Sequence, residues 1–225
     1  MRKKGKKRPI RGLIIIIIGV LLLGGGVFAV QQYAYTQETG SEDPKVSVPK
    51  TEGNTKEKSD NSIASKAGEA VAALKNKDMK KLSALVHPVK GVRLSPYAFV
   101  DMKNDRVLTA SQVENALNDS AKYTWGSFDG SGEPIEMTFA EYLNHFIYDK
   151  DYAGTDRIGY NQFFGKGNTK NNAFEVYTNA GIVEYHIPGV DPKFGGVDWG
   201  SLRLVFEESG GTWYLVGIIH DMWTI

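Results

Sequence analysis

The side chains best suited to chemistry lie in the C-terminal third of the sequence, where an acid, an imidazole and a guanidinium fall in runs of β-forming residues. Glu184 and His186 are two residues apart, so a strand would place both on one face. Arg203 alternates with Leu202 and Leu204, so it would face away from that apolar pair. If the two strands pair, the three polar groups can line one cavity, which would suit acid–base work or a carboxylate-bearing ligand.

An exposed cross-strand ion pair is the alternative role for the same residues, and it would contribute only ~0.2–1 kcal/mol. Trp199 follows a glycine-rich segment, residues 195–198, and can line a ligand groove, a partner surface or the core. We therefore assign Glu184, His186, Arg203 and Trp199 as candidate ligand-binding residues, and we assign no catalytic residue.

Metal and cofactor chemistry have little support in the sequence. It contains four histidines and no cysteine, and no two histidines have the His-x-x-x-His spacing of a zinc site. Residues 165–169 lack the spacing of a phosphate-binding Walker loop, and residues 149–151 lack the glycine and the glutamate of a calcium loop. The sequence therefore predicts neither a metal site nor a cofactor.

The elements that must position these groups begin with helices, whose starts are marked by capping residues. The predicted N-caps are Ser62, Asp78, Ser111 and Thr138. A glutamate three residues after each of the last two completes a capping-box pattern. The helix after Thr138 has the clearest apolar stripe, so we expect the helices to pack on one face of a sheet.

Strands follow the helices. The expected strands are residues 123–128, 134–138, 174–177, 181–187, 202–207 and 212–222, with hairpin turns at 129–132 and 209–211. Helices first and strands later predict an α+β domain in which the helices pack on a curved antiparallel sheet.

The last strand, residues 212–222, is expected at the centre of the sheet because both of its faces are apolar. Strict alternation would point one set of side chains one way and a second set the other way. The two sets are Trp213, Leu215 and Ile219, and Tyr214, Val216 and Ile218. Something must then cover the second face, either this chain or the partner of a homodimer formed through the sheet.

The start of the domain resembles a known superfamily. The phrase Ala-Leu-Lys-Asn-Lys-Asp at residues 73–78 is followed by Leu82, Leu85 and His87-Pro88. This order of residue types is similar to the opening of NTF2-like (cystatin-like, SnoaL-like) domains. The resemblance implies an NTF2-like cone, in which a curved sheet folds around the helices.

Longer segments resemble a family of uncharacterised exported or membrane-anchored proteins from Gram-positive bacteria. That resemblance rests on residues 87–97 (HPVKGVRLSPY), 123–132 (YTWGSFDGSG), 198–206 (DWGSLRLVF) and 213–223 (WYLVGIIHDMW). It extends over nearly the whole of residues 62–225. It implies a fold and a location outside the cytoplasm, and it implies no activity.

The N-terminal part predicts a single-pass membrane anchor. Residues 13–30, from Leu13 to Val30, form an uncharged and mostly apolar run of about 18 residues, which spans about 27 Å as a helix. Residues 1–12 carry about seven positive charges and no acidic one, which keeps this basic tail in the cytoplasm and sends the rest across. Residues 31–61 are polar and poor in large apolar residues, so we expect a flexible extracytoplasmic linker.

A cleaved signal peptide is the alternative, with cleavage after Ala29 and secretion of the rest. In both cases residues 62–225 lie outside the cytoplasm. The whole chain has a net charge of +1, so the part beyond the basic tail is acidic by about six charges. An acidic domain has no electrostatic footprint for nucleic acid, which excludes that class of partner.

No motif in the sequence specifies a reaction. We therefore expect a non-catalytic binding module at the outer face of the cell membrane, whose partner is a small ligand, a cell-wall component or another protein. The alternative is a small enzyme that uses an NTF2-like pocket and acid–base residues.

Overall fold

The computed structural model describes residues 62–224. The basic tail at 1–12, the anchor at 13–30 and the linker at 31–61 lie outside the described residues. Within residues 62–224, no helix combines the length and the hydropathy needed to span a bilayer.

Three of the four predicted helix starts are confirmed. Helix α2 (Ile63–Lys75) begins after Ser62, whose hydroxyl accepts a hydrogen bond from the Ser65 backbone N–H at 3.1 Å. Helix α3 (Met79–Leu85) begins after Asp78, and helix α5 (Phe139–Phe146) begins after Thr138 with a complete capping box. The caps satisfy backbone N–H groups that have no partner within the helix, which fixes each start.

The fourth helix start was predicted two residues too late. Helix α4 (Ala110–Asn115) is capped by Thr109 and not by Ser111. Thr109 has an extended backbone, and it exchanges reciprocal hydrogen bonds with Gln112, at 3.3 Å and 2.9 Å. Two capping-box patterns overlap in this segment. The helix uses the earlier pattern, which directly follows the end of strand β2 (Arg106–Leu108).

The main sheet has six strands in the order β2-β1-β8-β7-β6-β5. Beyond β2, its members are β1 (Val92–Ser95), β5 (Ile158–Tyr160), β6 (Ala180–Ile187), β7 (Gly200–Ser209) and β8 (Thr212–Met222). A separate hairpin pairs β3 (Tyr123–Ser127) with β4 (Pro134–Met137). The structure is thus an α+β domain, and the predicted hairpins 123–138 and 202–222 are confirmed.

The sheet is mixed, which corrects the expectation of an antiparallel one. Strand β1 runs parallel to β8, pairing Arg93 with Gly217 and Ser95 with Ile219. Immediately before β1, the Val86 bridge to Leu215 is also parallel. The chain leaves α3 already aligned with β8, and no hairpin turn joins the two strands, so nothing local imposes the antiparallel direction.

The predicted strand at 174–177 is wrong, because Ala173–Val176 forms the short helix α6. The Asn172 side chain explains the difference: it accepts a hydrogen bond from the Val100 N–H at 2.7 Å and donates one to the Val100 carbonyl at 3.0 Å. The backbone carbonyl of the same residue accepts from Glu175 and Val176. A contact distant in sequence therefore fixes the first residue of the turn, and β-propensity does not decide it.

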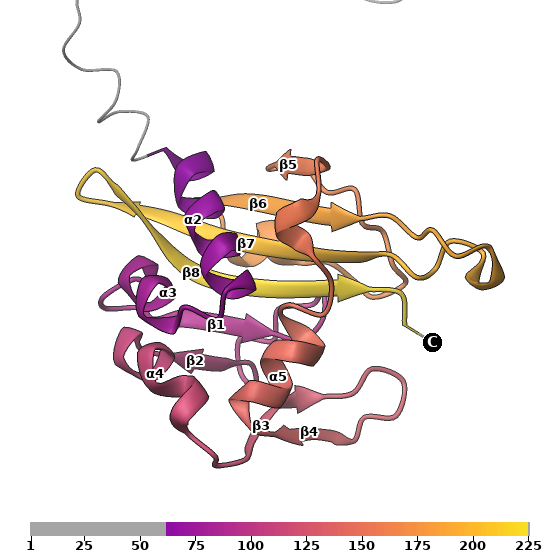
Figure 1. The fold of residues 1–225 in the computed structure, drawn as a ribbon, viewed down its shortest axis with the longest axis horizontal. Coiled ribbons are helices and arrows are strands. Elements are labelled where there is room, and N and C mark those ends of the chain that lie inside the picture. The colour runs from indigo at the N-terminus through magenta and orange to yellow at the C-terminus, as the bar shows by residue number, and fades with distance from the viewer. Residues whose placement is uncertain (1–61, 225) are drawn as a thin grey trace, which may run out of the picture. The chain divides into compact units, whose positions relative to one another are not determined.

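Strand β8 lies inside the sheet, as predicted, and both of its faces are packed. Helices α2 and α3 contact one face, and Figure 1 shows α2 crossing β6, β7 and β8. The chain itself covers the second face, where Phe163, Ala173 and Tyr177 pack against Val205 and Ile219. A homodimer partner is therefore not required to bury that face.

A bulge in β8 changes which side chains share a face. Val205 pairs with Gly217 and Phe206 with Leu215, so Val216 has no opposite residue. Leu215 therefore packs with Ile218 on the helix side, whereas strict alternation predicted Leu215 with Ile219. Glycine is required beside the bulge, because a Cβ at Gly217 would lie 2.8 Å from the Tyr177 hydroxyl.

Candidate functional site

The pairing of β6 with β7 brings two of the sequence-predicted site residues together. Glu184 lies opposite Arg203, and His186 lies opposite Ser201. On the next strand Asp221 lies opposite Ser201, so the polar groups share the sheet face that carries Arg203. Both Glu184 and Arg203 have 0% of their surface exposed, so the pair is internal and not a solvated ion pair.

The Arg203 guanidinium is the centre of a buried charge network. Its Nε donates to Glu184 Oε1 at 3.0 Å, and one terminal nitrogen donates to Asp221 Oδ2 at 2.5 Å and to the Gly165 carbonyl at 3.2 Å. The Phe163 ring lies 4.2 Å from the guanidinium carbon. Asp221 was not among the predicted site residues, although its place two residues after Ile219 puts it on the same face.

The other two candidates, His186 and Trp199, lie at the edge of this network. They line an open cavity of about 280 Å3, and their ring centroids are 5.9 Å apart. His186 Nδ1 lies 2.9 Å from the Ser201 hydroxyl. Burial lowers the pKa of His186, so the ring is neutral at neutral pH. Only these two of the four sequence candidates border this cavity, and a ligand-binding role for the set stays a prediction.

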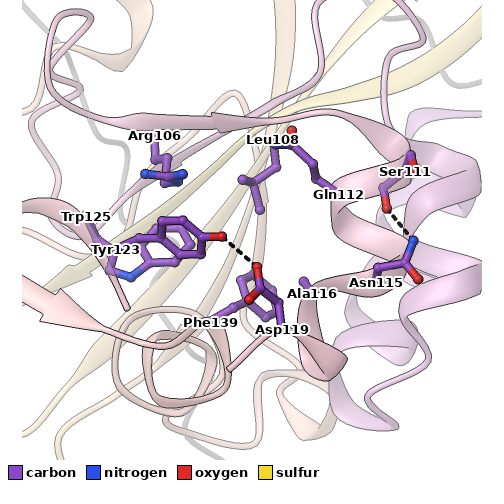
Figure 2. A pocket seen from close by; sticks show the side chains of 10 residues that line it. All are labelled: Arg106, Leu108, Ser111, Gln112, Asn115, Ala116, Asp119, Tyr123, Trp125 and Phe139. Carbon is purple, nitrogen blue, oxygen red and sulfur yellow. Dashed lines mark hydrogen bonds between the residues drawn. The ribbon is translucent and has the colours of Figure 1, made fainter. Parts of the chain in front are cut away.

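A second pocket, which the sequence analysis missed, lies where β2, α4, β3 and α5 meet (Figure 2). Its volume is about 260 Å3, and its lining combines a buried apolar part with a polar rim. The apolar residues are Leu108, Ala116, Trp125 and Phe139, and the polar ones are Arg106, Ser111, Gln112, Asn115, Asp119 and Tyr123.

The apolar part of this pocket is held rigidly by aromatic packing. The Trp125 indole N–H donates to the Met137 carbonyl at 2.8 Å, across the β3–β4 hairpin. The same ring stacks on Tyr142 of helix α5, with centroids 4.5 Å apart and planes at 23°. Trp125 is therefore fixed by both the hairpin and the helix, and it forms a rigid, buried part of the pocket wall.

The polar rim contains one cation whose hydrogen-bonding capacity is not used. The Arg106 guanidinium lies over the Tyr123 ring, with its carbon 3.9 Å from the ring centroid, and Figure 2 shows it facing the pocket aromatics. Within the described part of the chain, its Nε is buried and has no hydrogen-bond partner. An unpaired buried N–H carries a free-energy cost that an acceptor on a ligand would remove.

The neighbouring polar groups are already paired. The Tyr123 hydroxyl donates to Asp119 at 2.6 Å, and this bond lowers the pKa of Asp119. Gln112 is held in the α4 capping box, and the Asn115 amide donates to the Ser111 carbonyl at 2.9 Å. Arg106 is therefore the cation on this rim with a donor still to offer.

This chemistry favours binding over catalysis. A guanidinium does not release its proton at neutral pH, so Arg106 cannot act as a general acid. Asp119 is stabilised as an anion by Tyr123, which makes its carboxylate a poorer base. The pocket can hold and orient a ligand.

Sequence reasoning could not have found this pocket from local patterns. Arg106 lies on a strand of three residues, and its neighbours Asp119 and Tyr123 follow an intervening helix. The aromatic residues of the 123–128 strand were the available signal, but they were expected to pack in the core.

A histidine–carboxylate pair lies inside the helix side of the domain. His220 Nε2 is 3.0 Å from Asp149 Oδ1, which also accepts from the Tyr152 hydroxyl at 2.7 Å. His220 is fully buried, and its ring packs edge-on against Phe146. Across residues 62–224, no three histidine, aspartate or glutamate side chains converge to hold a metal ion.

Comparisons with known proteins add a weak structural likeness. No model of a protein family matches the chain, and no curated protein matches it. A solved structure from Xanthomonas campestris, described as a calcium/calmodulin dependent protein kinase II association domain, is 15% identical. The similarity covers 71% of this chain and 84% of that one, with a TM-score of 0.32. A likeness at this level carries no argument about the function of this chain.

Proposed function

We propose that this chain is a membrane-anchored extracytoplasmic binding module, and that its α+β domain is an NTF2-like cone. The pocket around Arg106 would bind a small ligand with an apolar or aromatic body and an anionic group. The apolar run at 13–30 and the basic tail before it support the anchor. The observation that carries the ligand class is the buried Arg106 Nε, which has no partner among residues 62–224 and borders an apolar pocket.

The anionic group would lie beside Arg106 and the apolar body against the apolar wall of the pocket. A carboxylate matches the guanidinium because both are planar and can form two parallel hydrogen bonds. The Tyr123 ring already holds the guanidinium in place at 3.9 Å, so little freedom remains to be lost on binding. Asp119 would disfavour a ligand with a second negative charge.

The alternative function is a small enzyme with acid–base residues. His220 and Asp149 are the described pair whose types suit proton transfer, with 3.0 Å between Nε2 and Oδ1. The pair is packed against Phe146, and none of the described cavities is lined by either residue. The binding function is therefore better supported. A cell-wall component, a protein partner or a homodimer would be an additional association of the same domain.

The ligand proposal is tested with benzoate, a planar aromatic carboxylate. Saturation-transfer NMR on the full chain in lipid nanodiscs should show saturable benzoate binding. Arg106→Gln should weaken it at least about tenfold, because a hydrogen bond to a charged group contributes ~1.5–3 kcal/mol. Arg106→Lys should retain part of the affinity, because it keeps the charge but loses the planar pair of donors.

Arg157→Gln is the matched control for this experiment. Its guanidinium also lies over an aromatic ring, 5.2 Å from the Phe164 centroid, but outside the pocket. Benzoate binding should be unchanged in that variant. Equal affinity for benzoate in wild type and Arg106→Gln, with both folded, would contradict the proposed site. Preference for benzamide over benzoate would contradict the proposed ligand class.

The topology has its own test in cells that express the full chain. Protease added to intact protoplasts should digest residues 62–225 and spare the first dozen residues, because the basic tail is held inside. Protection of the whole chain would overturn the proposed location. Release into the medium of a domain that begins at Val30 would replace the anchor with a signal peptide.

A further inference from the structure

A different cavity lies on the sheet face that carries Arg203. Its volume is about 430 Å3, and part of its wall is formed by Phe163 and Phe174, whose rings stack with centroids 4.7 Å apart and planes at 12°. Phe174 is 47% exposed, so this aromatic surface is open to a ligand. The carboxylate of Asp221, which is 3% exposed, also lines the cavity.

The buried charges beside this cavity do not balance. One guanidinium, Arg203, faces two carboxylates, Glu184 and Asp221. Both carboxylate oxygens of Glu184 accept a hydrogen bond, one from Arg203 and one from the Phe164 backbone N–H. Asp221 accepts from Arg203 through Oδ2 alone, and no described residue donates to its Oδ1. Asp221 Oδ1 can therefore accept a hydrogen bond from a ligand.

Asp221 Oδ1 faces the part of the cavity that Gly167 lines. A Cβ placed on Gly167 would lie 3.5 Å from this oxygen, so the absence of a side chain there leaves it approachable. Burial raises the pKa of Asp221 even though Arg203 is bonded to it. The ionised carboxylate is thus under-stabilised, which is the condition that a cationic ligand would relieve.

We propose that this cavity binds a small ligand that carries a protonated amine, with the ammonium donating to Asp221 Oδ1 and the apolar body lying against the edges of the Phe163 and Phe174 rings. Among the ionisable lining residues, Lys166 and Glu175 are exposed and Glu175 is paired with Lys170, so Asp221 is the buried charge of this lining. This site is independent of the Arg106 pocket, since the two share no lining residue.

Benzylamine is a suitable probe, because it joins an ammonium to a single aromatic ring. Saturation-transfer NMR on the full chain in nanodiscs should show saturable benzylamine binding. Asp221→Asn keeps the size of the side chain and an acceptor for Arg203, but it removes the negative charge. That variant should bind benzylamine at least about tenfold more weakly.

Three further variants make the result decisive. Glu175→Gln removes an exposed lining charge and should change benzylamine affinity by less than about threefold. Arg106→Gln should leave benzylamine binding unchanged, so the two proposals can fail separately. Phe174→Ala, at a half-exposed position, should weaken benzylamine binding without unfolding the domain. If Asp221→Asn does not fold, Phe174→Ala serves as the test in its place. Absence of saturable binding, or equal affinity in wild type and the folded Asp221→Asn or Phe174→Ala variant, would overturn the proposal.

Discussion

Replacing Arg203 with alanine is expected to lower the free energy of unfolding by about 3–5 kcal/mol. The guanidinium is fully buried and is bonded to both Glu184 and Asp221, so its removal leaves two carboxylates without their cation. Glu184 has no exposed surface, so it cannot regain water without opening the layer of chain that covers this face of the sheet. The loss of stability is therefore determined by the two carboxylates left without a cation. It is larger than the modest attraction of a surface ion pair would give.

Urea unfolding of the full chain in mild detergent, followed by tryptophan fluorescence, measures the effect of Arg203→Ala. Arg157→Ala is the control, because it removes an exposed arginine that also lies over a phenylalanine ring. We expect the control to change stability by less than about 1 kcal/mol. A change of similar size in Arg203→Ala would show that the network is solvated in solution.

A double-mutant cycle with Glu184→Ala gives an independent measure of the same network. Removing Glu184 alone leaves a smaller charge imbalance than removing Arg203, because Arg203 is still bonded to Asp221. The double variant should lose less stability than the sum of the two single variants, with a coupling energy of ~0.5–3 kcal/mol. Additive losses would mean that the 3.0 Å contact between Arg203 and Glu184 contributes nothing specific.

Asp105→Asn is expected to be more stable than wild type at pH 7, by up to about 3 kcal/mol. Asp105 is 7% exposed, and burial raises its pKa from 3.8 to about 6. That increase corresponds to about 3 kcal/mol, at ~1.4 kcal/mol for each tenfold change in the dissociation constant. The Ser95 hydroxyl at 2.5 Å and the Asp101 N–H at 2.9 Å both donate to Oδ2, which an asparagine oxygen can replace.

The sign of the pH dependence follows from the raised pKa of Asp105. Between about pH 4 and pH 6 the folded protein binds the proton and the unfolded chain does not, so rising pH destabilises the wild type. The asparagine cannot ionise and escapes this loss. The difference in free energy of unfolding between Asp105→Asn and wild type should therefore grow through this range and level off above about pH 6.

Urea unfolding of both proteins at several pH values between 3.5 and 7.5, a range chosen to bracket the expected transition, measures this difference. Asp78→Asn is the control of opposite sign, because hydrogen bonding from the Lys81 N–H lowers the pKa of that exposed helix cap. The support that Asp78 gives as a carboxylate is present above its unfolded pKa and is lost as the pH falls. A pH-independent difference for Asp105→Asn would mean that Asp105 is solvated.

Several features of the fold could be predicted because they depend on residues close together in the sequence. The caps at Ser62, Asp78 and Thr138 need only a side chain that reaches a backbone N–H three residues later. The hairpin between β7 and β8 is set by glycines in its turn. Period-two alternation was enough to put Glu184 and Arg203 on faces that could meet once β6 and β7 paired.

The remaining features depend on contacts between distant segments, and local patterns contain no information about those contacts. The sequence could not distinguish a solvated pair of Glu184 and Arg203 from a buried one, because burial depends on the 161–177 segment covering that face. The tertiary structure also decided that Asp221 joins Arg203, that β1 runs parallel to β8, and that Arg106 meets Tyr123 beside Trp125. Alternation determines which way a side chain points, whereas packing between segments determines what it meets and whether water reaches it.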